Sequence, residues 1–222
     1  MTKQTKITIT TFFFLLVSAI DISAIIYQDD LLRTIAKPLI MTFLVMLYLS
    51  AAEKPNLWFV LGLFFSFLGD VFLLFTTENF FMFGLGAFLL AHIMYIKITA
   101  GFLKKQSVTI MVSSAIPFVL LTAALLYLIK GNLGEMTIPV VIYAIVIATF
   151  GSVAFLNYRN EKSTANLWLF LGAVLFIISD SMIAINRFYE AKEMYGLLIM
   201  LTYIIAQYLI CKSMIAKSVS SK

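Results

Sequence analysis

The sequence predicts an all-α integral membrane protein with eight transmembrane helices. Of its 222 residues, 62% are hydrophobic and only 12% are charged, whereas soluble domains carry about 25% charged residues. The mean hydropathy is +1.02, and a helix needs about 20 apolar residues to cross a hydrocarbon core about 30 Å thick. Eight such helices would use about 160 residues. We therefore expect residues 1–222 to form a single membrane domain without a separate soluble part.

Each predicted helix is an apolar run bounded by polar or turn-forming residues. The runs are residues 7–26, 38–52, 57–75, 79–100, 108–129, 137–156, 166–185 and 194–216. Every connecting segment is short, so we expect consecutive helices to pack as neighbours. Lys37 stands just before Pro38, a residue suited to a first helical turn, and we expect it to open the second helix.

The distribution of Lys and Arg predicts the orientation of the chain. Eleven of the 16 Lys and Arg residues fall on the side of the two termini, and cytoplasmic loops carry the excess of positive charge. We expect a bacterial inner membrane protein with both termini in the cytoplasm. The first run is about 20 residues long and contains Asp21, which favours an uncleaved helix over a signal peptide.

Composition also excludes several kinds of site. The chain has one His and one Cys, His92 and Cys211, which are too few for a usual zinc site or a dithiol pair. The net charge of +5 comes from short loops between apolar runs, so we expect no nucleic-acid partner. We also expect no metal and no other cofactor.

Two stretches of the chain resemble each other and predict an internal repeat. Residues 56–70 and 166–180 align without a gap, and their shared residues include one Trp and the final aspartates Asp70 and Asp180. The repeats would cover about residues 1–106 and 107–222. Four helices per copy make the copies parallel. Chance similarity between Leu- and Phe-rich helices is the alternative interpretation.

Ionisable residues inside the runs are candidates for function, because a charge at membrane depth is costly unless it is paired or faces water. Asp70 and Asp180 lie about 21 Å along their helices at 1.5 Å per residue, and Asp21 and Lys37 fall at a similar level. A pair between Asp21 and Lys37 is an alternative, purely structural interpretation.

Polar residues on the fourth and eighth runs extend this candidate site. We expect His92 and Gln207 to form the floor of a shared cavity, with Tyr95 and Tyr203 on the same helix faces. Tyr203 and Gln207 are equally well explained by hydrogen bonds between helices.

The order of several short motifs resembles the YhhN-like lysoplasmalogenases. The motifs are Lys37-Pro38, Leu-Gly-Asp at 68–70, Gly-x7-His-x2-Tyr at 84–95, Ser179-Asp180 followed by Asn186, and Tyr203-x3-Gln207. The resemblance covers most of the chain. It implies an eight-helix membrane enzyme that hydrolyses the vinyl ether bond of lysoplasmalogens to a fatty aldehyde and a glycerophospho-alcohol. It also places Asp70 and Asp180 on the family's two membrane aspartates.

Vinyl ether hydrolysis needs one protonated acid and one ionised carboxylate, which two aspartates in unlike surroundings can supply. We hypothesise that Asp70 and Asp180 face each other across the repeat axis, with the donor role left open between them. Lys37 and Arg187 would hold the phosphate of the lysophospholipid, and Asp21 the ethanolamine ammonium. The other candidate substrate-binding residues are His92, Tyr95, Asn186, Tyr203 and Gln207.

Two other functions compete with a hydrolase. A proton-coupled transporter or exporter of an amphipathic substrate also has parallel repeats and intramembrane carboxylates, although few Gly or Pro residues interrupt the helices here. An intramembrane aspartyl protease resembles a Gly-x-Gly-Asp pattern, and this chain has Phe67-Leu68-Gly69-Asp70. The sequence leaves the oligomeric state open.

Overall fold

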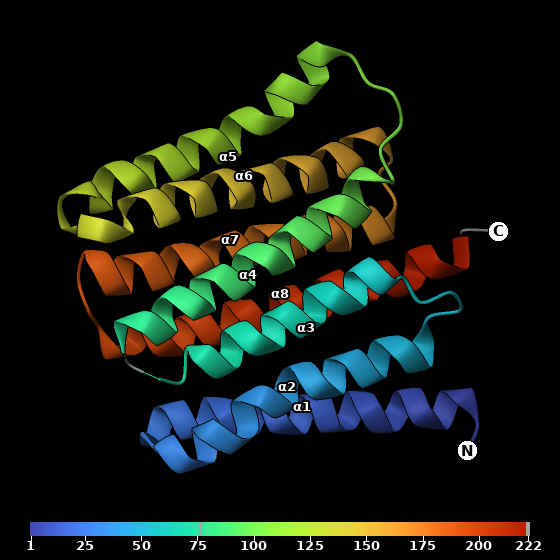
Figure 1. Ribbon diagram of the computed structural model, residues 1–222. Helices are drawn as coiled ribbons and strands as arrows, with labels where there is room; N and C mark the ends of the chain where they lie inside the picture. Colours follow the sequence, from blue (N-terminus) through green and yellow to red (C-terminus); the bar gives the residue numbers. More distant parts are fainter. Residues whose placement is uncertain (76, 221–222) are drawn as a thin grey trace. The chain divides into compact units, whose positions relative to one another are not determined.

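The computed structural model describes residues 1–75 and 77–220, and all regular structure in this part of the chain is helical (Figure 1). The α-helices are α1 (Lys3–Tyr27), α2 (Asp30–Ala51), α3 (Leu57–Phe72), α4 (Glu78–Ala100), α5 (Val108–Ile129), α6 (Thr137–Asn160), α7 (Thr164–Phe188) and α8 (Glu193–Ser220). Two short 3-10 helices, Lys130–Asn132 and Gly134–Met136, connect α5 to α6. The prediction of an all-α membrane protein is confirmed in this coarse form.

Seven of these helices are long and apolar enough to cross a membrane, and α3 is the shorter exception. Its 16 residues span about 24 Å at 1.5 Å per residue, less than the hydrocarbon core of about 30 Å. The helix ends at Phe72 because the backbone then forms tight turns, in which the amide of Phe75 bonds to the carbonyl of Phe72. The apolar run continues to residue 75, so composition alone did not show this end. An eight-span arrangement of two repeats stays a prediction.

The start of α2 differs from the expected one. The Asp29 side chain caps the helix by accepting a hydrogen bond from the amide of Leu32 at 2.9 Å, as short polar side chains do at helix N-termini. The helix therefore begins at Asp30, and the expectation that Lys37 and Pro38 open it is wrong. Lys37 is the eighth residue of α2 and lies within the helix.

The chain divides into two compact units, Met1–Met94 with Cys211–Lys222, and Tyr95–Ile210. In the first unit α1 packs on α2 and α2 packs on α3. In the second unit α5 packs on α6 and α6 packs on α7. These helix pairs run side by side in Figure 1, and they confirm that consecutive helices are neighbours in these places.

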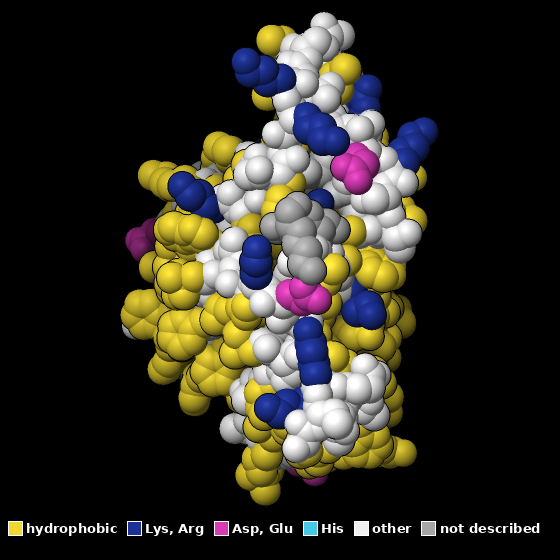
Figure 2. Space-filling model, turned by 90° about the vertical axis from the view of Figure 1, so that its right-hand side faces the viewer, with side chains coloured by type: hydrophobic (Ala, Val, Ile, Leu, Met, Phe, Trp, Pro, Cys, Tyr) yellow, Lys and Arg dark blue, Asp and Glu magenta, His cyan; other side chains and the backbone are white. Residues whose placement is uncertain are grey.

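The surface carries the apolar side chains that lipid contact requires. Large hydrophobic residues on the helices are exposed, for example Phe12 at 60% and Leu120 at 64%. In the view of Figure 2, Lys and Arg side chains lie among polar and backbone atoms, and hydrophobic side chains lie beside them. This pattern is typical of a protein embedded in a bilayer. The orientation of the chain in the membrane stays a prediction.

Candidate active site

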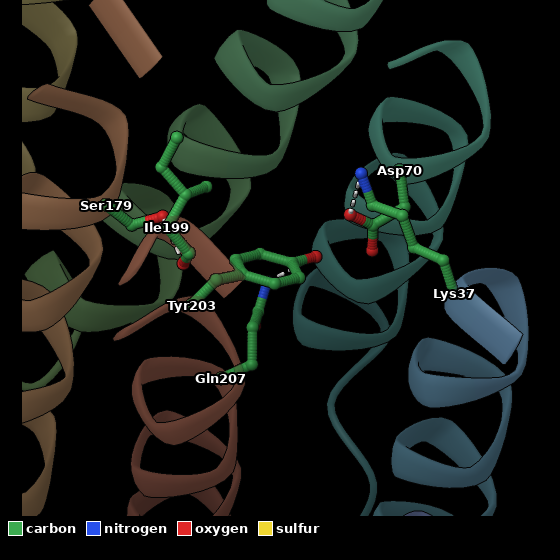
Figure 3. A network of polar contacts seen from close by, with 6 residues as sticks. All are labelled: Lys37, Asp70, Ser179, Ile199, Tyr203 and Gln207. Carbon is green, nitrogen blue, oxygen red and sulfur yellow. Dashed lines mark hydrogen bonds and ion pairs between the residues drawn. The ribbon is translucent and has the colours of Figure 1, made fainter. Parts of the chain in front are cut away.

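Asp70 lies in the last turn of α3 and forms an ion pair with Lys37 of α2. The two side chains point toward one another (Figure 3), with Lys37 Nζ 3.9 Å from Asp70 Oδ1. Both are buried, at 4% and 2% exposure. A carboxylate near the C-terminal end of a helix faces the negative end of the helix dipole, and burial adds a further cost. The ammonium group of Lys37 offsets both effects.

Asp21 of α1 is the second carboxyl group in this part of the first unit. It is 0% exposed, and neither of its carboxyl oxygens accepts a hydrogen bond from the described residues. The positive charges that act on it are those of Lys37 and Arg33, but the ion pair of Lys37 is made with Asp70. A buried carboxyl group without a hydrogen bond is rare in folded proteins. Asp21 is therefore a candidate for binding a donor from a ligand.

Gly69 precedes Asp70 and allows α4 to approach α3 closely. A Cβ atom at this position would lie 2.6 Å from the ring of Phe88, so only glycine fits without displacing the ring. The carbonyl of Phe88 lies 2.8 Å from Nδ1 of His92, which is 0% exposed. The structure thus places His92 in the interior of the first unit. Its role in a cavity floor stays a prediction.

Asp180 lies eight residues before the end of α7 and is only half-buried. Its Oδ2 atom accepts a hydrogen bond from the hydroxyl of Tyr143 on α6. The preceding residue, Ser179, donates a hydrogen bond to the carbonyl of Ile199 on α8 at 3.0 Å (Figure 3). Sequence reasoning missed Tyr143. The available indication was a phenol within an apolar run, because a buried tyrosine hydroxyl usually has a polar partner.

A second polar network links α4 and α8 within the second unit. Tyr95 donates a hydrogen bond to Oε1 of Gln207 at 2.9 Å, and Nε2 of Gln207 donates to the hydroxyl of Tyr203 at 3.4 Å. All three residues are buried, and the ring of Tyr203 contacts Phe176 edge to face. The structure therefore contains a hydrogen bond between helices at Gln207, as the alternative interpretation expected. A role in substrate binding is a separate prediction.

Asn186 and Arg187 lie in the last turn of α7. The side chain of Asn186 accepts a hydrogen bond from the amide of Lys192 at 3.0 Å, which closes the connection to α8. In that connection Lys192 Nζ lies 2.8 Å from Oε2 of Glu190, and this hydrogen bond raises the pKa of Lys192. Arg187 is exposed. Arg187 is accessible to an anionic group, and a role of Asn186 in substrate binding stays a prediction.

A groove between α5 and α6 has a volume of about 570 Å³ and a mainly apolar lining. Its side-chain hydroxyls belong to Thr122, Thr149 and Ser152. Each of them donates to a carbonyl of its own helix, at 2.9, 2.7 and 2.6 Å. Among the described residues that line the groove, the hydroxyl donors are thus all satisfied, and the surface suits a hydrocarbon chain.

Among the residues that the structure describes, no three His, Cys, Asp or Glu side chains are grouped as a metal site would require. The ionisable groups of the structure include two aspartates with different partners, Lys37 for Asp70 and Tyr143 for Asp180. Such groups can donate, accept and stabilise charge in acid and base chemistry.

The chain is similar to known proteins of one family. The model of the YhhN family matches residues 32–214. Proteins named lysoplasmalogenase from Mycobacterium bovis and Mycobacterium tuberculosis are each 32% identical over 174 residues, which cover 75% of this chain and 65% of the relative. Human lysoplasmalogenase TMEM86A is 34% identical over 156 residues, covering 68% of this chain and 62% of the relative. The matched part is thus just under two thirds of the length of these relatives. No solved structure matches the chain.

Proposed function

The chain belongs to the YhhN family, and from this premise we propose that it is a membrane hydrolase that cleaves the vinyl ether bond of lysoplasmalogens. Relatives from mycobacteria and human carry the name lysoplasmalogenase, which supports this substrate class. The observation that carries the proposal is the presence of two carboxyl groups in apolar helices, each held by its own polar partner: Asp70 by Lys37 and Asp180 by Tyr143.

The reaction needs no more than proton transfers and one water molecule. A carboxylic acid first donates its proton to the β-carbon of the vinyl ether, and the positive charge that results is shared by the α-carbon and the ether oxygen. Water then adds to the α-carbon and gives a proton to the second carboxylate. The hemiacetal collapses to a fatty aldehyde and an alcohol, and the proton transfers restore both carboxyl groups. We propose Asp70 and Asp180 for these two roles.

The head group of the lysophospholipid would be bound by charged residues. Asp21 is a buried carboxyl group whose oxygens accept no hydrogen bond from the described residues, and the ammonium of ethanolamine would supply the missing donor. The exposed Arg187 would bind the phosphate, as arginine does through paired hydrogen bonds. Lys37 forms an ion pair with Asp70, so we propose that it acts first on the catalytic carboxylate and that it also binds the phosphate.

The remaining candidates would shape the binding site. We propose that the hydrogen-bonded network of Tyr95, Gln207 and Tyr203 supplies a polar layer for the glycerol part of the substrate. His92 is held by its contact with the carbonyl of Phe88, and Asn186 orders the end of α7 through Lys192. From these positions both would line the substrate-binding site.

The test is release of aldehyde from lysoplasmenylethanolamine by the purified protein in detergent. Asp70→Asn and Asp180→Asn should each lower the rate by about 100-fold or more, the range of general acid and base catalysis. The matched control is Asp30→Asn, because Asp30 is exposed at the start of α2. Full activity in either of the first two variants would contradict the two-aspartate mechanism. Uptake into vesicles driven by a pH gradient, without lipid turnover, would favour a transporter.

A further inference from the structure

Tyr143 is a tyrosine inside an apolar helix, and its hydroxyl forms a hydrogen bond with Asp180. The residue lies on α6, is 9% exposed and donates a hydrogen bond to Oδ2 of Asp180 on α7. Within hydrocarbon no water is available to replace such a bond, so a buried polar group depends on its protein partner. The hydrogen bond therefore orients the carboxyl group of Asp180.

The strength of this hydrogen bond depends on the charge of Asp180. Hydrogen bonds to an ionised acceptor are roughly twice as strong as those between neutral groups. When Asp180 gives up a proton, negative charge develops on its carboxyl group and the bond from Tyr143 becomes stronger. When a carboxylate accepts a proton from water, the same bond becomes weaker. Only an interaction that is stronger in the transition state accelerates a reaction, so this bond favours the role of proton donor.

Asp70 is paired with a cation, whereas the hydroxyl that contacts Asp180 is neutral. Lys37 is a cation, and its Nζ lies 3.9 Å from Asp70 Oδ1 with both side chains buried. An ion pair of this kind requires the carboxylate form of Asp70, because a lysine charge left without a counter-charge in the membrane is costly. Asp70 is therefore suited to stabilise a cation and to accept a proton from water.

We infer that Asp180 is the proton donor of the reaction and that Tyr143 is its positioning residue; this inference rests on the proposed function. The proton of Asp180 goes to the β-carbon of the vinyl ether, and the π electrons of the double bond form the new C–H bond. Asp180 is left as a carboxylate that accepts the hydrogen bond of Tyr143. Asp70, as the carboxylate, later takes the proton of the attacking water.

The first experiment compares Tyr143→Phe with Tyr158→Phe. Both change one tyrosine of α6, and Tyr158 stacks on Phe170. We expect Tyr143→Phe to lower kcat for lysoplasmenylethanolamine by about tenfold, the difference between a charged and a neutral hydrogen bond, with KM unchanged. Tyr158→Phe should leave both constants as they are. An unchanged kcat in Tyr143→Phe, or a loss that lies entirely in KM, overturns the inference.

A second variant covers the case in which Tyr143→Phe does not fold. Incorporation of 3-fluorotyrosine at position 143 nearly preserves the size of the ring and makes the hydroxyl a stronger donor. We expect kcat to rise, and the same replacement at position 158 to have no effect. A rate that does not respond at position 143 contradicts the role of the hydroxyl.

Infrared difference spectroscopy tests the assignment without turnover. Asp180→Asn should remove the C=O band of a protonated carboxyl group, and Tyr143→Phe should shift that band. A band that disappears in Asp70→Asn and persists in Asp180→Asn assigns the proton to the other aspartate and overturns the inference. Failure of the proposed function has a different result, because the wild-type protein would then release no aldehyde at all.

Discussion

Asp70 and Asp180 end matching stretches of sequence, but their surroundings in the two units differ. Asp70 is 2% exposed, lies in the last turn of a short helix and faces a lysine. Asp180 is half-buried, lies well inside a longer helix and accepts a hydrogen bond from a tyrosine. Similar sequences thus present one carboxyl group to a cation and the other to a neutral donor. Two aspartates with different tasks need this kind of difference.

The residues before the two aspartates show the same contrast. Gly69 has no side chain, so the ring of Phe88 on α4 packs directly against α3. Ser179 instead donates a hydrogen bond to the carbonyl of Ile199 on α8. Each residue contacts the next helix along the chain, one by close packing and the other by a hydrogen bond. The comparison predicts that substitutions in the first unit have the larger effects on stability.

The largest effect is expected from Lys37→Met. It removes the lysine partner of the buried carboxylate of Asp70, and loss of one partner of a buried pair costs about 3–5 kcal/mol. Replacing both partners, as in Lys37→Met with Asp70→Leu, should recover most of the free energy of unfolding and none of the activity. Denaturant titration in detergent measures this, with Lys54→Met in an exposed position as the control. Equal stability of the Lys37→Met variant and the wild type would remove the contrast between the two aspartates.

Asp21→Asn tests whether the charged groups of the first unit bind the head group. The ammonium of ethanolamine donates hydrogen bonds to a carboxylate, whereas the quaternary ammonium of choline has no N–H donor. We expect the preference in kcat/KM for the ethanolamine substrate to fall by about tenfold, as loss of a charged hydrogen bond implies. Rates are measured for both lysoplasmalogens, with Asp30→Asn alongside. An unchanged preference would show that Asp21 does not contact the head group.

The smallest effects are expected at the residues before the aspartates. Gly69→Ala would place a Cβ atom 2.6 Å from the Phe88 ring, and overpacking of this kind costs about 1–3 kcal/mol. Ser179→Ala removes one hydrogen bond, at a cost of about 1 kcal/mol. The control is Gly86→Ala on α4, where a Cβ atom would meet no atom within 4 Å and helix propensity favours alanine. Thermal unfolding should show Gly69→Ala as the least stable variant, Ser179→Ala as the next and Gly86→Ala as the most stable. A Ser179→Ala variant less stable than Gly69→Ala would contradict the larger effects expected in the first unit.

Much of the architecture was predictable from the sequence because the apolar runs are long and the breaks between them are polar. Each run agrees with its helix to within four residues at both ends, except that α2 begins eight residues before its run. The differences at α2 and α3 have local causes. At α2 the Asp29 cap starts the helix before Pro38, which a rule about proline in the first turn did not anticipate. At α3 the backbone turns after Phe72 although the residues that follow are apolar.

The candidate site was predictable in part. A carboxyl group in an apolar run is costly wherever the helix packs, so Asp21, Asp70 and Asp180 stood out without a structure. Their partners did not, because Lys37 and Asp70 are 33 residues apart and Tyr143 and Asp180 are 37 apart. No local pattern links residues at such separations.

The sequence by itself determined the membrane environment, the positions of most helices and the few residues able to carry charge chemistry, since these depend on composition and on runs along one chain. Only the tertiary structure decided that Lys37 pairs with Asp70 while Asp21 accepts no hydrogen bond from the described residues, and that Tyr143 binds Asp180. Partner choice depends on which faces of separate helices meet, and that is set by packing between helices.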